Sequence, residues 1–158
     1  MRLRDWLVKV QLSKLKISLP FLEMEWEPRD VDRAAAWDMY VELLTRITTQ
    51  RLPAGTGDEK TALDSIYSLF GTTREILRRH GRGAERFAQI AIVVLNQIIR
   101  PFTARWHRLS LAGAFGDAPQ CVVFRTELES LQRDLRHYMG ALADLAQVED
   151  LTDLQPEG

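Results

Sequence analysis

The sequence has little of several things that would narrow its function quickly, beginning with cysteine. Cys121 is the single cysteine among 158 residues, so no disulfide can form within the chain, and sites built from several thiolates are excluded. Long hydrophobic runs are missing as well, because the longest, residues 90–95, is far too short to cross a bilayer. The formal net charge of −1 leaves no global field that would draw the chain onto nucleic acid or a membrane. We therefore expect a cytoplasmic protein with no integral membrane segment.

The length and composition that remain suit one globular domain. With 46% hydrophobic and 27% charged residues, a chain of this size can bury a core without crosslinks or metals. Up to Trp26 apolar and polar residues alternate, whereas from Val31 onward apolar residues recur every three or four positions. This change predicts a mainly α fold, a four-helix up-down bundle over residues 28–148, preceded by a short N-terminal β arm or hairpin over residues 1–27. The acidic tail, residues 149–158, is expected to fray.

The predicted arm is the first candidate for partner binding. Its alternating apolar positions are Leu15, Ile17, Leu19, Leu22, Met24 and Trp26. The first half of the segment is basic and the second half acidic, so opposite charges could face each other across a hairpin. An isolated hairpin is marginal in water, so it must lie on the helices, pair with a second copy or pair with a partner. Because unpaired strand edges recruit other strands, we interpret the arm as a partner-binding element.

Helix-breaking residues set the expected helix boundaries. The first helix is expected from about Asp30 to Gln50, where the loop of residues 52–59 stops it with one proline and two glycines. The second ends at Gly81 and Gly83, the third begins just after them, and the fourth begins at Pro119. Since the connecting loops are short, neighbouring helices should run antiparallel.

Metal binding and catalysis find little support in the motifs. Di-iron bundles use Glu-x-x-His, but none of His80, His107 and His137 follows a glutamate at that spacing. Cys121 lies at a predicted helix start, yet it also begins the apolar seam of the fourth helix, where a small buried hydrophobe is the commoner role. Neither a nucleotide-binding loop nor a G-x-S-x-G motif is present. We predict no metal, no cofactor and no enzymatic activity.

An arginine cluster at the second helix–helix connection offers a nucleic-acid alternative. It comprises Arg74, Arg78, Arg79, Arg82 and Arg86. Three of these are spaced by four residues and could share a helical face that meets phosphates. Cations also complement the dipole at the end of a helix, so a solvated basic end is the favoured interpretation.

The stretch VLNQIIRPFTARWH, residues 94–107, places polar groups on the most apolar element. Pro101 lacks an N–H and clashes with the carbonyl of Gln97, which predicts a kink in the third helix. We favour a structural lock between helices, in which a buried Arg100 pairs with Glu42. The full set proposed for this lock is Glu42, Arg46, Arg100, Pro101 and Trp106. Alternatively, the kink opens a pocket in which Asn96, Arg100, Arg105 and His107 bind an anionic ligand such as a nucleotide.

Three strings also resemble a group of bacterial helical proteins. These are WDMYVELLTRI, SLFGTTREILRRHG and VLNQIIRPFTARWH, together with a Trp-Glu-Pro entry at residues 26–28. Within them, the group's Tyr-Val-Glu-Leu-x-Thr-Arg run begins at Tyr40, and its Arg-Pro and Trp-His pairs begin at Arg100 and Trp106. The resemblance covers roughly residues 26–107. It implies an accessory protein of a bacterial system such as antiphage defence or signalling, and it transfers no catalytic residue because the group has no established activity.

Taken together, these patterns predict a non-catalytic helical interaction module that binds a protein partner or itself. A sensor of an anionic ligand at the kink is the first alternative. A nucleic-acid-binding accessory that acts through the arginine cluster is the second.

Overall fold

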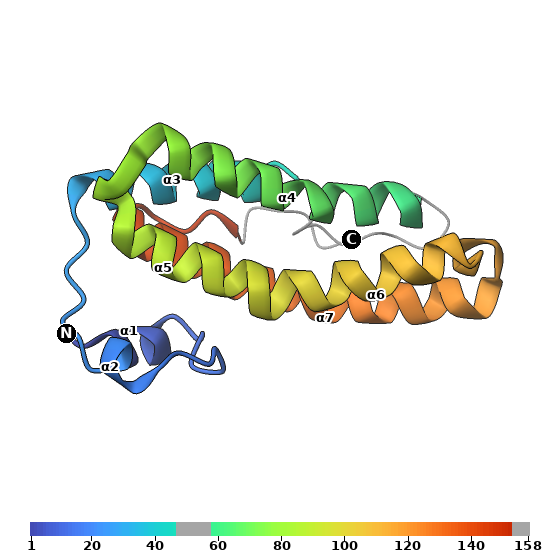
Figure 1. Ribbon diagram of the computed structural model, residues 1–158, viewed down its shortest axis with the longest axis horizontal. Coiled ribbons are helices and arrows are strands. Elements are labelled where there is room, and N and C mark those ends of the chain that lie inside the picture. The colour runs from blue at the N-terminus through green and yellow to red at the C-terminus, as the bar shows by residue number, and fades with distance from the viewer. Residues whose placement is uncertain (47–57, 153–158) are drawn as a thin grey trace.

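The computed structural model describes residues 1–46 and 58–152, and in these the chain is mainly helical, as predicted (Figure 1). The α-helices are α1 (Leu3–Lys9), α2 (Leu19–Leu22), α3 (Asp30–Leu44), α4 (Glu59–His80), α5 (Glu85–Val94), α6 (Arg100–Leu111) and α7 (Ala118–Ala146). Short turns of other helix types are η1 (Gly81–Ala84), η2 (Leu95–Ile99) and η3 (Ala114–Gly116). The predicted extension of the first helix from residue 47 to 50, and the loop through residue 57, lie outside the described residues.

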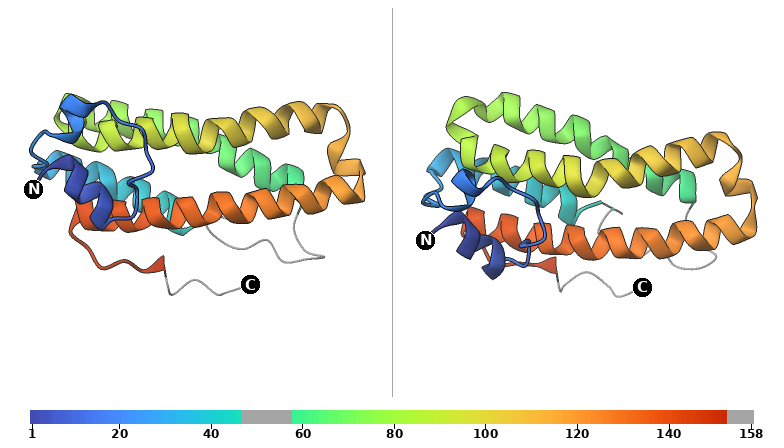
Figure 2. Two further views of the ribbon diagram at one scale, coloured as in Figure 1. Left: turned by 90° about the horizontal axis from the view of Figure 1, so that it is seen from below. Right: turned by 60° about the horizontal axis from the view of Figure 1, so that its bottom comes forward.

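The long helices form a bundle. α3, α4, the continuous rod α5–η2–α6, and α7 lie lengthwise beside one another, and α3 packs against both α7 and α4 (Figures 1 and 2). One hydrophobic core runs through the bundle. The seam predicted for α7 faces it, with Phe124, Leu128, Leu135 and Leu142 all at most 2% exposed. Fully burying such a side chain stabilises the fold by roughly 1.5–3 kcal/mol.

A single buried carboxylate fixes where two helices begin. Asp32 accepts the backbone N–H of Arg29 at 2.8 Å, before the first turn of α3. Its other oxygen accepts the N–H of Phe87 at 3.0 Å, in the first turn of α5. Because the first N–H groups of a helix have no partner within it, this side chain satisfies one donor at each start and ties α3 to α5.

The prediction of a β arm is wrong. No strand occurs in the described residues, and the segment instead forms α1 and α2, joined by one isolated antiparallel bridge between Arg2 and Glu25. Leu3, Trp6 and Leu7 are all buried, and their spacing of three and four is that of a helix. The predicted attraction between the basic and acidic halves is present, since Arg2 and Arg4 both pair with Glu23. The opposite charges of the two halves therefore attract each other between two short helices instead of two strands.

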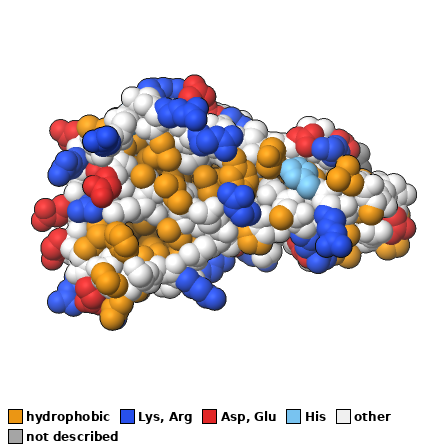
Figure 3. All heavy atoms as spheres, viewed as in Figure 1, with side chains coloured by type: hydrophobic (Ala, Val, Ile, Leu, Met, Phe, Trp, Pro, Cys, Tyr) orange, Lys and Arg blue, Asp and Glu red, His pale blue; other side chains and the backbone are white. Residues whose placement is uncertain are grey.

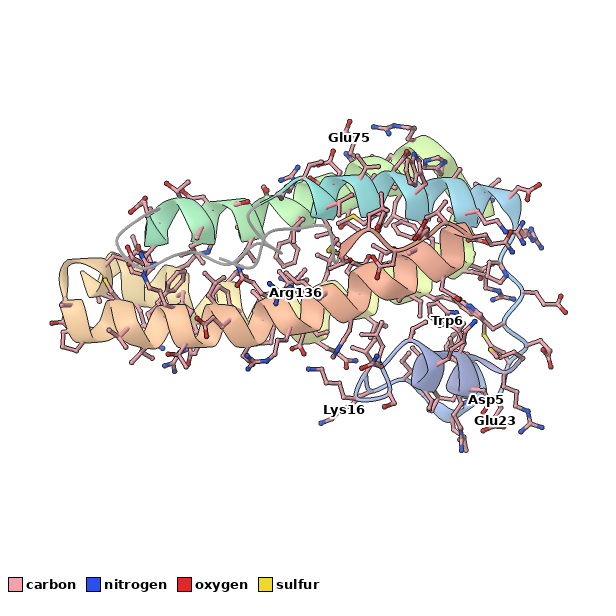
Figure 4. The ribbon with its side chains drawn as sticks, turned by 180° about the vertical axis from the view of Figure 1, so that it is seen from behind. Asp5, Trp6, Lys16, Glu23, Glu75 and Arg136 are labelled. Atoms are coloured by element: carbon pink, nitrogen blue, oxygen red, sulfur yellow. The ribbon has the colours of Figure 1, made fainter. Side chains whose placement is uncertain are left out.

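This N-terminal segment, residues 1–27, is built onto the bundle. The Trp6 indole stacks on Trp26 with ring centroids 4.7 Å apart and donates to Asp144 of α7 at 2.6 Å. The Gln97 side chain forms two hydrogen bonds with the backbone of Lys16. It accepts the N–H of Lys16 and donates to its carbonyl, at 2.7 Å each. In Figure 4, Trp6 points from α1 toward the bundle, whereas Asp5 and Glu23 lie on the far side of the segment. The segment is therefore a fixed cap on the bundle.

The tail departs from the expected fraying as far as Thr152. The Tyr40 hydroxyl donates to Asp150 at 3.1 Å and accepts the backbone N–H of Leu151 at 2.5 Å. Thr152 closes a turn onto Asp150, with its backbone N–H 3.0 Å from the carboxylate. Residues 149–152 are thus held against α3, and residues 153–158 lie outside the described part of the chain.

The π-helical turn η2 lies directly before α6, in which Pro101 is the second residue. The kink predicted at Pro101 stays a prediction. A π turn pairs each N–H with the carbonyl five residues back, so the regular ladder is already interrupted where proline supplies no N–H. The Thr103 hydroxyl donates to the carbonyls of Ile99 and Arg100, each at 3.2 Å.

The stretch Glu59–Leu111 also contains a window apolar enough to cross a membrane by length and composition alone. Half of that window is buried inside the bundle, and the core helix of a soluble protein passes the same test.

Candidate functional site

The structural lock does not have the predicted pairing. Arg100 is exposed, lies over the Phe70 ring at 4.9 Å and donates to Asn96 at 3.2 Å, so the structure does not bring it to Glu42. Glu42 instead pairs with Arg46 at 2.7 Å. The two remaining members of the proposed lock have other surroundings. Pro101 is exposed, and Trp106 is 1% exposed in an aromatic cluster with Phe115 and Phe124.

Two other polar contacts hold the helices together in its place. Arg46, two residues after the end of α3, reaches α4, donating to Ser68 at 2.5 Å and to Thr72 at 3.1 Å. The Trp106 indole of α6 donates to Glu127 of α7 at 2.5 Å. Each of these bonds joins neighbouring helices at one register, which is the role that the sequence assigned to Arg100.

The residues of the predicted anion pocket are spread along the α4–α6 surface. Arg105 pairs with Glu127 at 3.2 Å, and His107 packs edge-on against Tyr67 with ring centroids 4.8 Å apart. Asn96 and Arg100, which precede these two residues in the chain, bond to each other. None of the cavities found among the described residues is lined by all four groups. The arrangement therefore provides cations on a surface and no enclosed anion site there.

The five arginines of the predicted cluster fall into two groups, according to whether they form ion pairs with the described residues. Arg79 pairs with Asp38 and with Glu75, each at 3.2 Å, beside a 2.6 Å contact between His80 and Asp38. The other four, Arg74, Arg78, Arg82 and Arg86, form no ion pair with the described residues. The half-buried Arg86 contacts Met24 and Gln89. Unneutralised positive charge thus gathers at the end of α4 and the start of α5.

Cys121 has the surroundings of a structural thiol. Its Sγ donates to the carbonyl of Phe115 at 3.4 Å. Burial raises the pKa of the thiol, and the nearby Glu59 carboxylate raises it further. Because the thiolate is the nucleophile, these surroundings oppose the activation that a helix start would supply. Within the described part of the chain, no group of three or more His, Cys, Asp or Glu side chains is placed to hold a metal ion.

An apolar groove between α2 and α5 is the most distinctive surface feature. It holds about 400 Å³. Leu3, Ile17 and Phe21 of the N-terminal segment line one side, and Ala88, Ile92 and Val93 of α5 line the other. Phe21 is 49% exposed, Ile92 45%, and Leu19 beside them 61%. Figure 3 shows hydrophobic side chains gathered on this face of the molecule, with Lys and Arg as well as Asp and Glu side chains around them.

The same local structure that buries one side of the N-terminal segment exposes the other. The N–H of Leu3 donates to the carbonyl of Met24 at 3.0 Å, and that of Trp26 donates to Met1 at 2.7 Å, so α1 and the end of α2 are fixed together. Trp6 and Trp26 are then buried in the core, while Phe21 of α2 lines the groove beside α5 and Leu19 is exposed. Of the six residues predicted to bind a partner, Leu15 and Trp26 are buried, and Ile17, Leu22 and Met24 are half-buried. Leu19 alone is exposed.

A second, more polar cavity of about 410 Å³ also adjoins the N-terminal segment. It is lined by Lys14, Leu15, Lys16, Gln97, Ile98 and Asp134. Lys14 pairs with Asp134, so the charge of Lys14 is largely neutralised within the fold.

Sequence reasoning missed Phe21 and Ile92. The period-two interpretation gave Phe21 no role. Ile92 lies in the longest hydrophobic run, residues 90–95, and the signal available there was that excess of apolar residues. A helix in a bundle needs one apolar stripe to pack against the core. Apolar residues outside that stripe must be covered by another part of the chain or by a partner.

No family model, curated protein or solved structure matches the chain.

Proposed function

We propose that this protein is a non-catalytic interaction module, a four-helix up-down bundle that binds a partner protein through the groove between α2 and α5. The observation that carries the proposal is the joint exposure of Phe21 and Ile92 on the two walls of that groove. Contiguous apolar surface of this kind is uncommon on monomers and marks interaction sites. The partner, in this proposal, brings the apolar side of a helix, because a groove between helices accepts such a helix lengthwise.

The predicted role of the N-terminal segment in binding is kept in this proposal, but its mechanism changes. The segment offers no strand edge; it supplies one wall of the groove through Phe21, with Leu3 as its buried floor. We propose that the module belongs to a bacterial cytoplasmic system, an assignment supported only by the motifs at residues 26–107.

A matched pair of variants tests the proposal in a lysate of the source cells. Ile92→Asp puts a charge in the groove, and Val122→Asp puts one at a 65% exposed apolar position on α7. The tagged full chain should capture a protein that is lost with Ile92→Asp and retained with Val122→Asp, with both variants folded by circular dichroism. Equal capture by the two variants would refute the groove as the binding site.

A further inference from the structure

We infer that the groove takes an acidic amphipathic helix, whose apolar side covers Phe21 and Ile92 and whose carboxylates meet a row of cations beside them. The row comprises Arg74, Arg78, Arg100 and Lys16. The inference rests on the proposed function, because it names the chemistry of the partner that the groove binds.

The helix register places the α4 arginines along the groove. α4 and the α5–η2–α6 rod run antiparallel, and Arg100 lies over Phe70 at 4.9 Å (Figure 1). Arg74 and Arg78 follow Phe70 by one and two turns, and Ile92 precedes Arg100 by about two turns. Arg78 therefore lies level with Ile92, on the side of α5 opposite the wall made by α2.

The remaining cation borders the groove from the N-terminal segment. The backbone of Lys16 is fixed by its two bonds to Gln97, and Lys16 directly precedes Ile17 of the groove wall. Gln97 lies five residues after Ile92 on the same rod, toward Arg100. Cations thus stand on both sides of one end of the groove.

No ion pair with the described residues neutralises these four cations. All four side chains are exposed, and Arg100 has only the neutral amide of Asn96 as a hydrogen-bond partner. By contrast, Arg79 and Arg105 each pair with a carboxylate. Positive charge is left available along the groove, and an acidic partner complements it.

Glu85 lines the groove at the first turn of α5, the end away from Arg100. A carboxylate of the partner is disfavoured directly beside Glu85. A nucleic acid would meet the same cations through phosphates, but its backbone has no apolar side that covers Phe21 and Ile92. The combined chemistry favours a helix over a polyanion.

Two synthetic peptides test the inference on the full chain. Each is a helix of about 18 residues, roughly 27 Å long, with one leucine stripe, and its flanking positions are either all glutamate or all lysine. Fluorescence anisotropy should show the glutamate peptide binding about tenfold more tightly than the lysine peptide, with the preference falling as salt rises. The double variant Arg74→Glu and Arg100→Glu should reverse the preference. Arg133→Glu, at an exposed position on α7, should leave it unchanged.

The outcomes separate the inference from the function on which it rests. Equal binding of both peptides that is lost in Ile92→Asp would keep the groove as a docking site and overturn the acidic partner. If a peptide still binds the Ile92→Asp variant, or if an oligonucleotide binds in the same way as the peptide, then both the helix as the occupant and the groove as its site would be overturned. A dimer in light scattering that Ile92→Asp dissociates would identify a second copy as the occupant and overturn the inference. If neither peptide binds, the acidic-helix inference is also overturned. The proposed function would then be decided by the capture experiment from the lysate alone.

Discussion

Arg46 and Arg100 show how single residues exchange roles between the predicted and the observed structure. Both were expected to join the helices, and both contact α4 in the structure. Arg46 is 26% exposed at its side chain and bonds to Glu42, Ser68 and Thr72. Arg100 is exposed and lies over the Phe70 ring of α4. The difference depends on where the fold places each residue, since Arg46 follows the end of α3 and Arg100 begins α6 at an exposed position, and residue type does not reveal that.

Alanine substitutions should separate these two arginines. Arg46→Ala removes charged hydrogen bonds between α3 and α4, and we expect it to lower the free energy of unfolding by about 1–2 kcal/mol. Arg100→Ala should change it by less than about 0.5 kcal/mol, because it alters an exposed surface contact. Urea unfolding followed by circular dichroism measures both. A larger loss for Arg100→Ala than for Arg46→Ala would restore the predicted lock.

Tyr138 carries a polar group that the core does not satisfy. The residue is 2% exposed, and its hydroxyl has no hydrogen-bond partner among the described residues. Since burying an unpaired hydroxyl is costly, Tyr138→Phe should raise the free energy of unfolding by about 1 kcal/mol. Tyr40→Phe is the matched control, because the Tyr40 hydroxyl bonds to Asp150 and Leu151. That variant should lose stability, and a thermal melt in which both shift in the same direction would contradict the account.

The same two tyrosines predict a sensitivity to alkaline pH. Burial raises the pKa of Tyr138 far above its ordinary value of 10.0, and burial is also the main cause of the raised pKa of Tyr40. A raised folded-state pKa gives stability that is fully present below the unfolded value, near pH 10, and is lost as pH rises through the folded value. Stability should therefore fall above about pH 10, and less steeply in Tyr138→Phe, as denaturant midpoints across that range would show.

At the scale of elements, the long helices were predictable and the N-terminal segment was not. The apolar positions of the 29-residue helix α7, such as Phe124, Leu128, Leu131 and Leu135, follow one helical period. The stretch of residues 15–26 is short, and most of its apolar residues alternate with polar ones, so a period of two also fits it. The burial of the N-terminal segment is decided by contacts that no local pattern contains, such as Gln97 with Lys16 and Asp144 with Trp6.

Trp6 offers the sharpest test of the N-terminal segment as part of the core. It is 2% exposed, stacks on Trp26 and donates to Asp144. Trp6→Ala should cost about 3–5 kcal/mol of unfolding free energy, whereas Val8→Ala, at a 62% exposed position of the same helix, should cost little. Deletion of residues 1–27 should likewise destabilise the bundle, because it uncovers apolar core. A truncated bundle with an unchanged melting temperature would show that the segment is an independent arm.

For the whole molecule, the groove follows from how the parts pack. Phe21 and Ile92 are 71 residues apart in sequence, and they face each other only because α1 and Trp26 anchor α2 beside α5. Periodicity could predict the bundle, and the charge pattern could predict that the two halves of the N-terminal segment attract. The docking surface could not be predicted, since it depends on which apolar residues the finished fold leaves uncovered.

Site-specific photocrosslinking tests the docking surface most directly. A photoreactive phenylalanine analogue placed at Phe21 keeps an aromatic side chain on the groove wall, and the same analogue at Val122 of α7 serves as the control. In cells, the account predicts one discrete crosslinked protein from position 21, which Ile92→Asp abolishes, and none from position 122. The same adducts from both positions, or adducts from position 21 that survive Ile92→Asp, would contradict it.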